Sequence, residues 1–139
     1  MYTGDIYRYL DSIIISPNDY AVFDIDGTLI DNSGLSIPNI LAVYRYVQSK
    51  GIKNVIITAR VGVEPNITYT IQQLLTLGVT GFHDIYFLPS GVYPSAAAQA
   101  EYKYHARKDL HDKGRNVVMS IGDMPWDIGA YGGMGFIVT

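Results

Sequence analysis

Apolar runs of four to seven residues recur along the chain, separated by segments with helical features. The runs predict strands over residues 20–24, 54–58, 84–88, 116–122 and 135–139. Apolar residues three or four apart predict helices over residues 4–14, 38–50 and 67–77. A segment rich in helix formers, ending before a glycine, predicts a further helix over 96–113.

The strand-like runs are continuously apolar and do not alternate with polar residues. This pattern is typical of strands buried on both faces of a parallel sheet. With helices between them, the sequence predicts an α/β fold: a doubly wound, Rossmann-like, five-stranded parallel sheet with helices on both faces. The chain has 139 residues and no internal repeat or linker, so we expect a single domain over 1–139.

Polar side chains gather where the predicted strands end, which is where such folds bind ligands. Asp24 ends the first strand and Asp26 follows it, Thr58 ends the second, and Asp123 and Asp127 follow the fourth. So many carboxylates at one edge repel one another, and a divalent cation would neutralise them. Oxygen ligands without any cysteine favour a hard ion, Mg²⁺.

Composition narrows the classes of protein that fit. The net charge is −3, so the chain lacks the excess of basic residues that would indicate a nucleic-acid-binding surface. No apolar stretch approaches the roughly 20 residues that span a bilayer, and the N-terminal segment lacks the features of a signal peptide. We therefore expect a cytoplasmic protein without membrane contact. Tyr2, Tyr7 and Tyr9 could cover the face of a homo-oligomer.

Four motifs occur in a characteristic order: "DIDGT" at 24–28, "ITAR" at 57–60, Lys103, and "GDMPWD" at 122–127. In this order they resemble the motifs of the haloacid dehalogenase (HAD) superfamily of phosphohydrolases. Residues 95–123 are also similar to its acid phosphatase branch, in which a Tyr-Lys-x-x-x-Arg run, here Tyr102, Lys103 and Arg107, precedes the last motif. That branch usually has Glu where Gly27 stands.

The resemblance implies roles for the catalytic residues. Asp24 is expected to be the nucleophile that forms an aspartyl-phosphate. Asp26 is expected to protonate the leaving alcohol and then to activate water. Thr58 is expected to hydrogen-bond the transferring phosphoryl group, and Lys103 to neutralise its charge.

The resemblance also implies a metal site. Asp24, Asp123 and the backbone carbonyl of Asp26 are expected to bind Mg²⁺. Asp127, one helical turn after Asp123, is expected to bind it directly or through water, or to pair with Lys103.

Lesser contacts are expected from the remaining candidates. Gly27 and Thr28 make the tight turn after the acidic pair, and their amides could hold phosphate oxygens. Arg60 and Arg107 are candidates for substrate contact, the latter on the same helical face as Lys103.

The chain leaves no room for the cap domain that HAD enzymes commonly carry. Residues 29–38 are too few to form one, and residues 61–102 contain only the helix and strand that the sheet requires. We therefore expect an HAD-like fold without a cap domain. The loops at 29–38 and 89–95 are expected to determine specificity.

The sequence thus predicts a Mg²⁺-dependent phosphomonoester hydrolase acting on a small phosphorylated substrate such as a nucleotide. One alternative is a polynucleotide end-phosphatase, although the acidic pI counts against it. Another is a phospho-receiver module, which carries its phosphorylated Asp on the third strand, whereas here that strand ends in "FLPSG". A catalytically inactive scaffold is the remaining alternative.

Overall fold

The computed structural model describes residues 2–138 and contains all the predicted strands and helices. In chain order the elements are α1 (Gly4–Ser12), β1 (Asp19–Phe23), α2 (Pro38–Ser49), β2 (Lys53–Val61), α3 (Asn66–Thr76), β3 (Asp84–Leu88), α4 (Ala96–Asp112), β4 (Asn116–Gly122), the 3₁₀ helix η1 (Pro125–Asp127) and β5 (Met134–Ile137). β2 is longer than predicted, and Thr139, at the end of the last predicted strand, lies outside the described residues.

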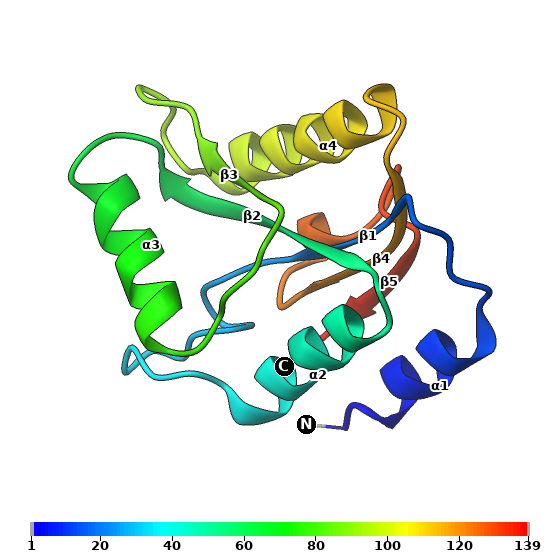
Figure 1. Ribbon diagram of the computed structural model, residues 1–139. Coiled ribbons are helices and arrows are strands. Elements are labelled where there is room, and N and C mark those ends of the chain that lie inside the picture. Colours follow the sequence, from blue (N-terminus) through cyan, green and yellow to red (C-terminus); the bar gives the residue numbers. More distant parts are fainter. Residues whose placement is uncertain (1, 139) are drawn as a thin grey trace.

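The strands form one parallel sheet in the order β3-β2-β1-β4-β5. The chain moves outward from β1 to β3, then returns past β1 to β4 and β5. Because such crossovers are right-handed, this reversal places α4 on the opposite face of the sheet from α2. Figure 1 shows this arrangement, with α1 and α2 on one side and α4 on the other. The predicted doubly wound fold is confirmed.

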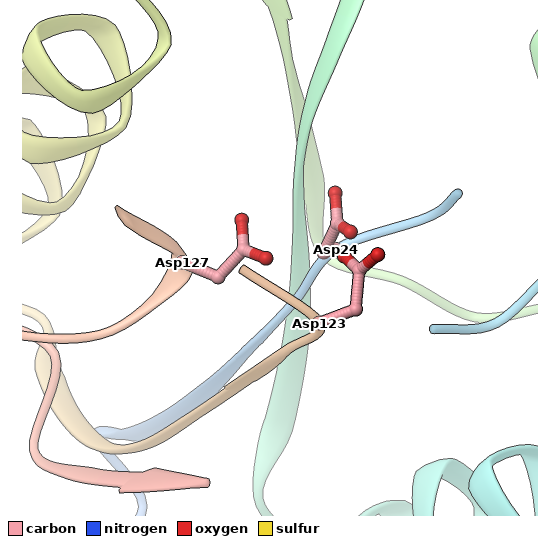
Figure 2. Close-up of side chains that lie close together, drawn as sticks. All are labelled: Asp24, Asp123 and Asp127. Atoms are coloured by element: carbon pink, nitrogen blue, oxygen red, sulfur yellow. The ribbon is translucent and has the colours of Figure 1, made fainter. Parts of the chain in front are cut away.

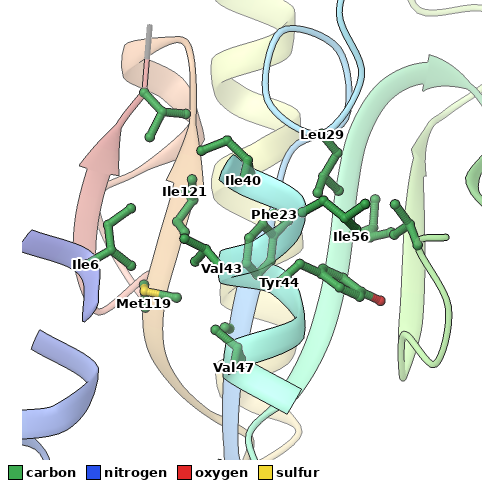
Figure 3. Close-up of a cluster of buried hydrophobic side chains, with 14 of the residues drawn as sticks. Ile6, Phe23, Leu29, Ile40, Val43, Tyr44, Val47, Ile56, Met119 and Ile121 are labelled. Atoms are coloured by element: carbon green, nitrogen blue, oxygen red, sulfur yellow. The ribbon is translucent and has the colours of Figure 1, made fainter. Parts of the chain in front are cut away.

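Side chains of the central strand β1 alternate between two apolar clusters. Ala21 and Phe23 point into the larger one, between the sheet and helices α1 and α2, which Figure 3 shows. Tyr20 and Val22 point into a smaller cluster against α4. Burial on both faces explains why the strand is a continuous apolar run. It also fixes the end of β1, and therefore Asp24, at the middle of the sheet.

The strand order bears on the alternative of a receiver module. Receivers share the flavodoxin-like order 2-1-3-4-5, in which the first strand neighbours the third. Here β1 lies between β2 and β4. The architecture is therefore not that of a receiver.

No cap domain is found among residues 2–138. Residues 29–38 form a short loop closed by a bridge between Ile30 and Ser36, and residues 61–102 contain α3, β3 and their connections. Each helix within residues 2–138 is too short or too polar to cross a bilayer.

Two of the three N-terminal tyrosines are engaged within the chain. The ring of Tyr7 packs on Tyr46, and the hydroxyl of Tyr9 donates to the Val118 carbonyl at 2.7 Å. Tyr2 is exposed. A homo-oligomer formed through this face stays a prediction.

Phe23 is the largest apolar residue of β1 in the main cluster, fully buried and edge-on to Tyr44, with ring centroids 5.3 Å apart. We expect Phe23→Ala to lower the free energy of unfolding by about 3–5 kcal/mol, because it leaves a cavity in the core. Urea denaturation measures this. Tyr93→Ala, which removes a ring that is 82% exposed, should change the free energy by less than about 0.5 kcal/mol. Equal effects of the two changes would contradict this account of the core.

Candidate active site

The three carboxylates of the site come from neighbouring elements at the carboxyl edge of the sheet. Asp24 follows β1 and Asp123 follows β4, two strands that pair directly. The backbone N–H of Asp24 continues this pairing by donating to the Ile121 carbonyl at 3.1 Å. Asp127 closes η1, and carboxylate oxygens of all three residues lie within 4.8 Å of one another. Figure 2 shows their side chains converging.

This edge is the point at which the strand order reverses, between β1 and β4. The segments that follow β1 and β4 leave this edge in opposite directions, and the space between them forms a crevice in which a ligand can bind. The crevice is a cavity of about 110 Å³ that Asp24, Asp26, Asp123 and Asp127 line together with Lys103.

Lys103 supplies the buried positive charge of the site from α4. Its ammonium group donates to Asp24 Oδ1 at 2.8 Å and also contacts Asp127 Oδ1. Thr28 Oγ1 donates to the other oxygen of Asp24 at 3.2 Å. Asp127 Oδ2 accepts from the backbone N–H of Met124 at 2.9 Å. Asp24 and Asp127 are therefore both anchored by hydrogen bonds.

Burial sets the direction of the pKa shifts of Asp24 and Asp127, and ion pairing sets that of Lys103. Burial raises the pKa of Asp24 to about 6, although Lys103 acts in the opposite direction. Burial and the charge of Asp24 likewise raise the pKa of Asp127. For Lys103, burial lowers the pKa, but Asp24 and Asp127 outweigh it and the pKa is raised. The ammonium therefore stays charged at neutral pH.

Two glycines let the carboxylates approach the backbone closely. Gly27 has a φ of +79°, and a Cβ there would lie 2.2 Å from Asp123 Oδ2. A Cβ on Gly122 would lie 2.1 Å from the Cβ of Asp127. In this backbone arrangement the Glu that is usual at the position of Gly27 would clash with Asp123.

The turn amides of Gly27 and Thr28 have hydrogen-bond partners within the chain. The N–H of Gly27 donates to the Ile30 carbonyl at 2.8 Å, and that of Thr28 donates to Ile25 at 3.1 Å. These bonds close the turn itself. The structure adds a contact that was not predicted for this pair, in which the Thr28 hydroxyl donates to Asp24. A contact between the turn amides and phosphate oxygens stays a prediction.

Asp26 turns away from the cluster of three carboxylates. Its side chain is 61% exposed and forms an ion pair with Arg60, Nη2 to Oδ1, at 2.8 Å. It is therefore absent from the carboxylates that could share a cation. A role for its backbone carbonyl in binding Mg²⁺ stays a prediction.

Thr58 is buried near the end of β2, and its hydroxyl accepts from the backbone N–H of Arg60 at 3.1 Å. Its neighbour Ala59 lines the cavity. The register of β2 against β3 shifts at this point, between Ile57 and Val61. A contact between the Thr58 hydroxyl and a phosphoryl group stays a prediction.

Arg107 makes structural contacts within the chain, and the substrate contact expected of it stays a prediction. It is 4% exposed, and its guanidinium donates to the carbonyls of Trp126 and Ala130, both at 2.9 Å. It therefore fastens the segment that carries Asp127. Spacing alone placed Arg107 beside Lys103 on α4, but its longer side chain reaches past the cavity to this segment.

Three further residues line the cavity without having been singled out as site residues: Gln99, Met124 and Trp126. Gln99 lies four residues before Lys103, so helical spacing could have indicated it. Met124 and Trp126 lie inside the last motif, between its two acidic residues.

Comparison with known proteins identifies the class. Residues 35–135 match the family model described as HAD superfamily, subfamily IIIB (acid phosphatase). This is well over half of the chain, so the chain belongs to that family. The matched segment includes Thr58, Lys103, Asp123 and Asp127 and begins after Asp24.

Two individual proteins are similar to the chain. Vegetative storage protein 2 of Arabidopsis thaliana is 33% identical over 102 residues, which are 73% of this chain and 36% of that protein. The chain thus spans about a third of the length of this relative. The NMR structure of the core domain of a Streptococcus pneumoniae protein, assigned as a phosphoglycolate phosphatase, is 24% identical, with a TM-score of 0.49. That alignment covers 81% of this chain and 71% of the other.

The raised pKa of Asp24 has a consequence for stability that can be measured with chelator present. Folding raises the pKa of the Asp24 carboxyl group from 3.8 to about 6, so the folded protein binds this proton more tightly than the unfolded chain does. The resulting contribution to the free energy of unfolding is largest at pH values below 3.8. That contribution is lost as the pH rises through the higher value. We therefore expect Asp24→Asn to become more stable relative to wild type as the pH rises from about 4 to 7.

Urea denaturation in EDTA across this pH range measures the difference. The matched control is Asp112→Asn, at an exposed carboxylate on α4. A difference for Asp24→Asn that stays constant with pH, or that moves in the opposite direction, would contradict the raised pKa.

Proposed function

We propose that the chain is a Mg²⁺-dependent phosphomonoester hydrolase that works through a phosphate ester on Asp24. The observation that carries the proposal is the contrast between two carboxylates. Asp24 is 8% exposed and is held by Lys103 and Thr28 inside the cavity. Asp26, two residues on, is open to water. Membership of an acid phosphatase family supports the same reaction.

In the first half of the proposed reaction, a carboxylate oxygen of Asp24 forms a bond to phosphorus. The bond between phosphorus and the alcohol oxygen breaks, and Asp26 gives its proton to that oxygen. The ammonium of Lys103 lies 2.8 Å from Asp24, so it is placed to offset the charge of the incoming phosphoryl group.

In the second half, a water molecule attacks phosphorus and gives a proton to Asp26. The bond between phosphorus and Asp24 breaks, which releases phosphate and restores both groups. An accessible carboxylate suits this step, because the water must reach it from solvent. The exposure of Asp26 provides such access.

The donor set suits a hard divalent cation. Asp24, Asp123 and Asp127 offer carboxylate oxygens alone, and Lys103 balances only one of their three charges. Bound there, Mg²⁺ would neutralise the remaining charge and polarise the phosphoryl oxygens.

We infer that the substrates are small phosphomonoesters, such as nucleotides, whose leaving group is held outside the catalytic cavity. The catalytic cavity, of about 110 Å³, has room for little more than the phosphoryl group, so the leaving group must lie outside it. A second cavity of about 270 Å³ adjoins Arg60 and is lined by Val61, Asn66, Tyr69 and Thr70. Tyr69 offers an exposed ring on which a flat leaving group could stack.

Replacement of the proposed nucleophile tests the reaction. We expect Asp24→Asn to lower phosphate release from p-nitrophenyl phosphate by at least about 1,000-fold, because an amide cannot form the ester. Asp112→Asn, which makes the same chemical change far from the cavity, should retain activity. In ¹⁸O-labelled water the side chain of Asp24 should acquire label over many turnovers. Full activity in Asp24→Asn would contradict the proposal.

The same assay resolves the class of substrate. Nucleoside monophosphates, glycerol phosphate and a 5′-phosphorylated oligonucleotide are compared by kcat/KM. A preference for the oligonucleotide would favour a polynucleotide end-phosphatase over the small-molecule enzyme proposed here.

Metal dependence is tested by chelation and by Asp123→Asn. EDTA should abolish phosphate release, and Mg²⁺ should restore it. Mg²⁺ at a hundredfold excess over its Kd should stabilise the fold by about 2.7 kcal/mol, a rise of several degrees in Tm. In Asp123→Asn this rise should disappear. An equal Mg²⁺-induced rise in wild type and Asp123→Asn would contradict the assigned ligand.

A further inference from the structure

A chain of polar contacts connects α3 to Asp26 through Arg60. Arg60 Nε donates to Asp26 Oδ2 at 3.0 Å and Nη2 donates to Oδ1 at 2.8 Å. The third nitrogen, Nη1, donates to Gln73 Oε1 at 2.7 Å and to Thr70 Oγ1 at 3.2 Å. All three nitrogens of the guanidinium are therefore engaged, and its orientation is fixed.

The helix that holds Arg60 is itself anchored. Thr70 is 1% exposed and Leu74 is fully buried in the main apolar cluster. Gln73 lies between them in sequence and presents its amide to Arg60. Asp26, by contrast, has a side chain that is 61% exposed, so packing does little to fix it. The contacts from α3, made through Arg60, thus fix a side chain that packing leaves free to move.

The hydrogen bonds also define what Asp26 can do in this position. Both of its oxygens accept an N–H, which is the pattern of an ionised carboxylate. Each oxygen keeps a further lone pair for a water molecule. Held in this way, Asp26 can take a proton from water, whereas giving a proton to an alcohol requires it to rearrange. The arrangement therefore suits the second half of the reaction.

We propose that Arg60, fixed by Gln73 and Thr70, is a positioning residue that holds Asp26 as the proton acceptor for the water that cleaves the phosphate ester on Asp24. This inference rests on the proposed function. It assigns to the polar contacts of α3 a part in the hydrolysis of the intermediate and none in its formation.

The experiment separates the two half-reactions with p-nitrophenyl phosphate. Nitrophenolate leaves without being protonated, so formation of the ester, which sets kcat/KM, does not need Asp26 as an acid. We expect Arg60→Met to lower kcat by about 10- to 100-fold, part of the effect of a general base, and to leave kcat/KM within about threefold of wild type. Gln73→Leu, which keeps Arg60, should lower kcat by about 3- to 10-fold and should likewise leave kcat/KM within about threefold of wild type.

A second readout is the pre-steady-state burst of nitrophenolate release. When hydrolysis of the ester becomes slow, stopped-flow mixing should release one nitrophenolate per active site before the slow steady state. Gln72→Leu, the same change at the neighbouring exposed position, should match wild type in kcat and show no added burst. Melting temperatures verify that each variant is folded.

Asp26→Asn separates failure of this inference from failure of the proposed function. It should show a full burst and a large loss of kcat, and adding Gln73→Leu should cause no further loss. If Asp26→Asn lacks the burst, its assignment in the proposed reaction is wrong. If it shows the burst while the Arg60 and Gln73 variants match wild type, only the inference fails. Parallel losses of kcat and kcat/KM in the Arg60 and Gln73 variants would also overturn it, because they would place Arg60 in ester formation or substrate binding.

Discussion

The candidate active site depends on one buried ammonium group, that of Lys103. Lys103 is 3% exposed and touches Asp24 and Asp127, which are themselves almost fully buried. Isolated charges are costly to bury; here the ammonium favours the ionised form of both carboxylates, and the carboxylates favour the charged form of the ammonium. Removing the lysine would leave two uncompensated carboxylates in the interior, a change that costs about 3–5 kcal/mol for a broken buried pair. The contact is therefore a condition for the site to exist and only secondarily a source of stability.

The topology makes this contact possible. The reversal between β1 and β4 brings Asp24 and the segment carrying Asp127 to the same edge, although about a hundred residues separate them in sequence. The crossover from β3 to β4 passes through α4, which delivers Lys103 to that edge from the opposite face to α2. Arg107, one turn further along α4, fastens the segment around Asp127 through two carbonyls. Helix α4 and the reversal of strand order between β1 and β4 therefore act together to assemble the site.

The sequence predicted the parts that depend on local pattern. Continuous apolar runs predicted the parallel strands. The ends of these runs predicted that Asp24 and Asp123 lie close together, because the carboxyl ends of parallel strands meet at one edge of the sheet. Contacts that depend on the reach of long side chains were not predictable in this way. Arg107 shares a helical face with Lys103 yet binds carbonyls outside the cavity, and the link from Gln73 to Arg60 joins two elements whose spacing only the folded chain defines.

Two aspartates with identical side chains acquire different properties from the cations beside them. Lysine is a compact point charge on a flexible stem, so it can contact Asp24 in the cavity and still leave the room that the proposed reaction needs for a phosphoryl group. Arginine is a planar fork with five donors, so it can grip both oxygens of Asp26 and still bind α3. Exchanging the two cations would fill the cavity with a guanidinium and leave the exposed carboxylate with a single movable partner. The different roles proposed for the two carboxylates therefore depend on the shape of each cation as much as on its charge.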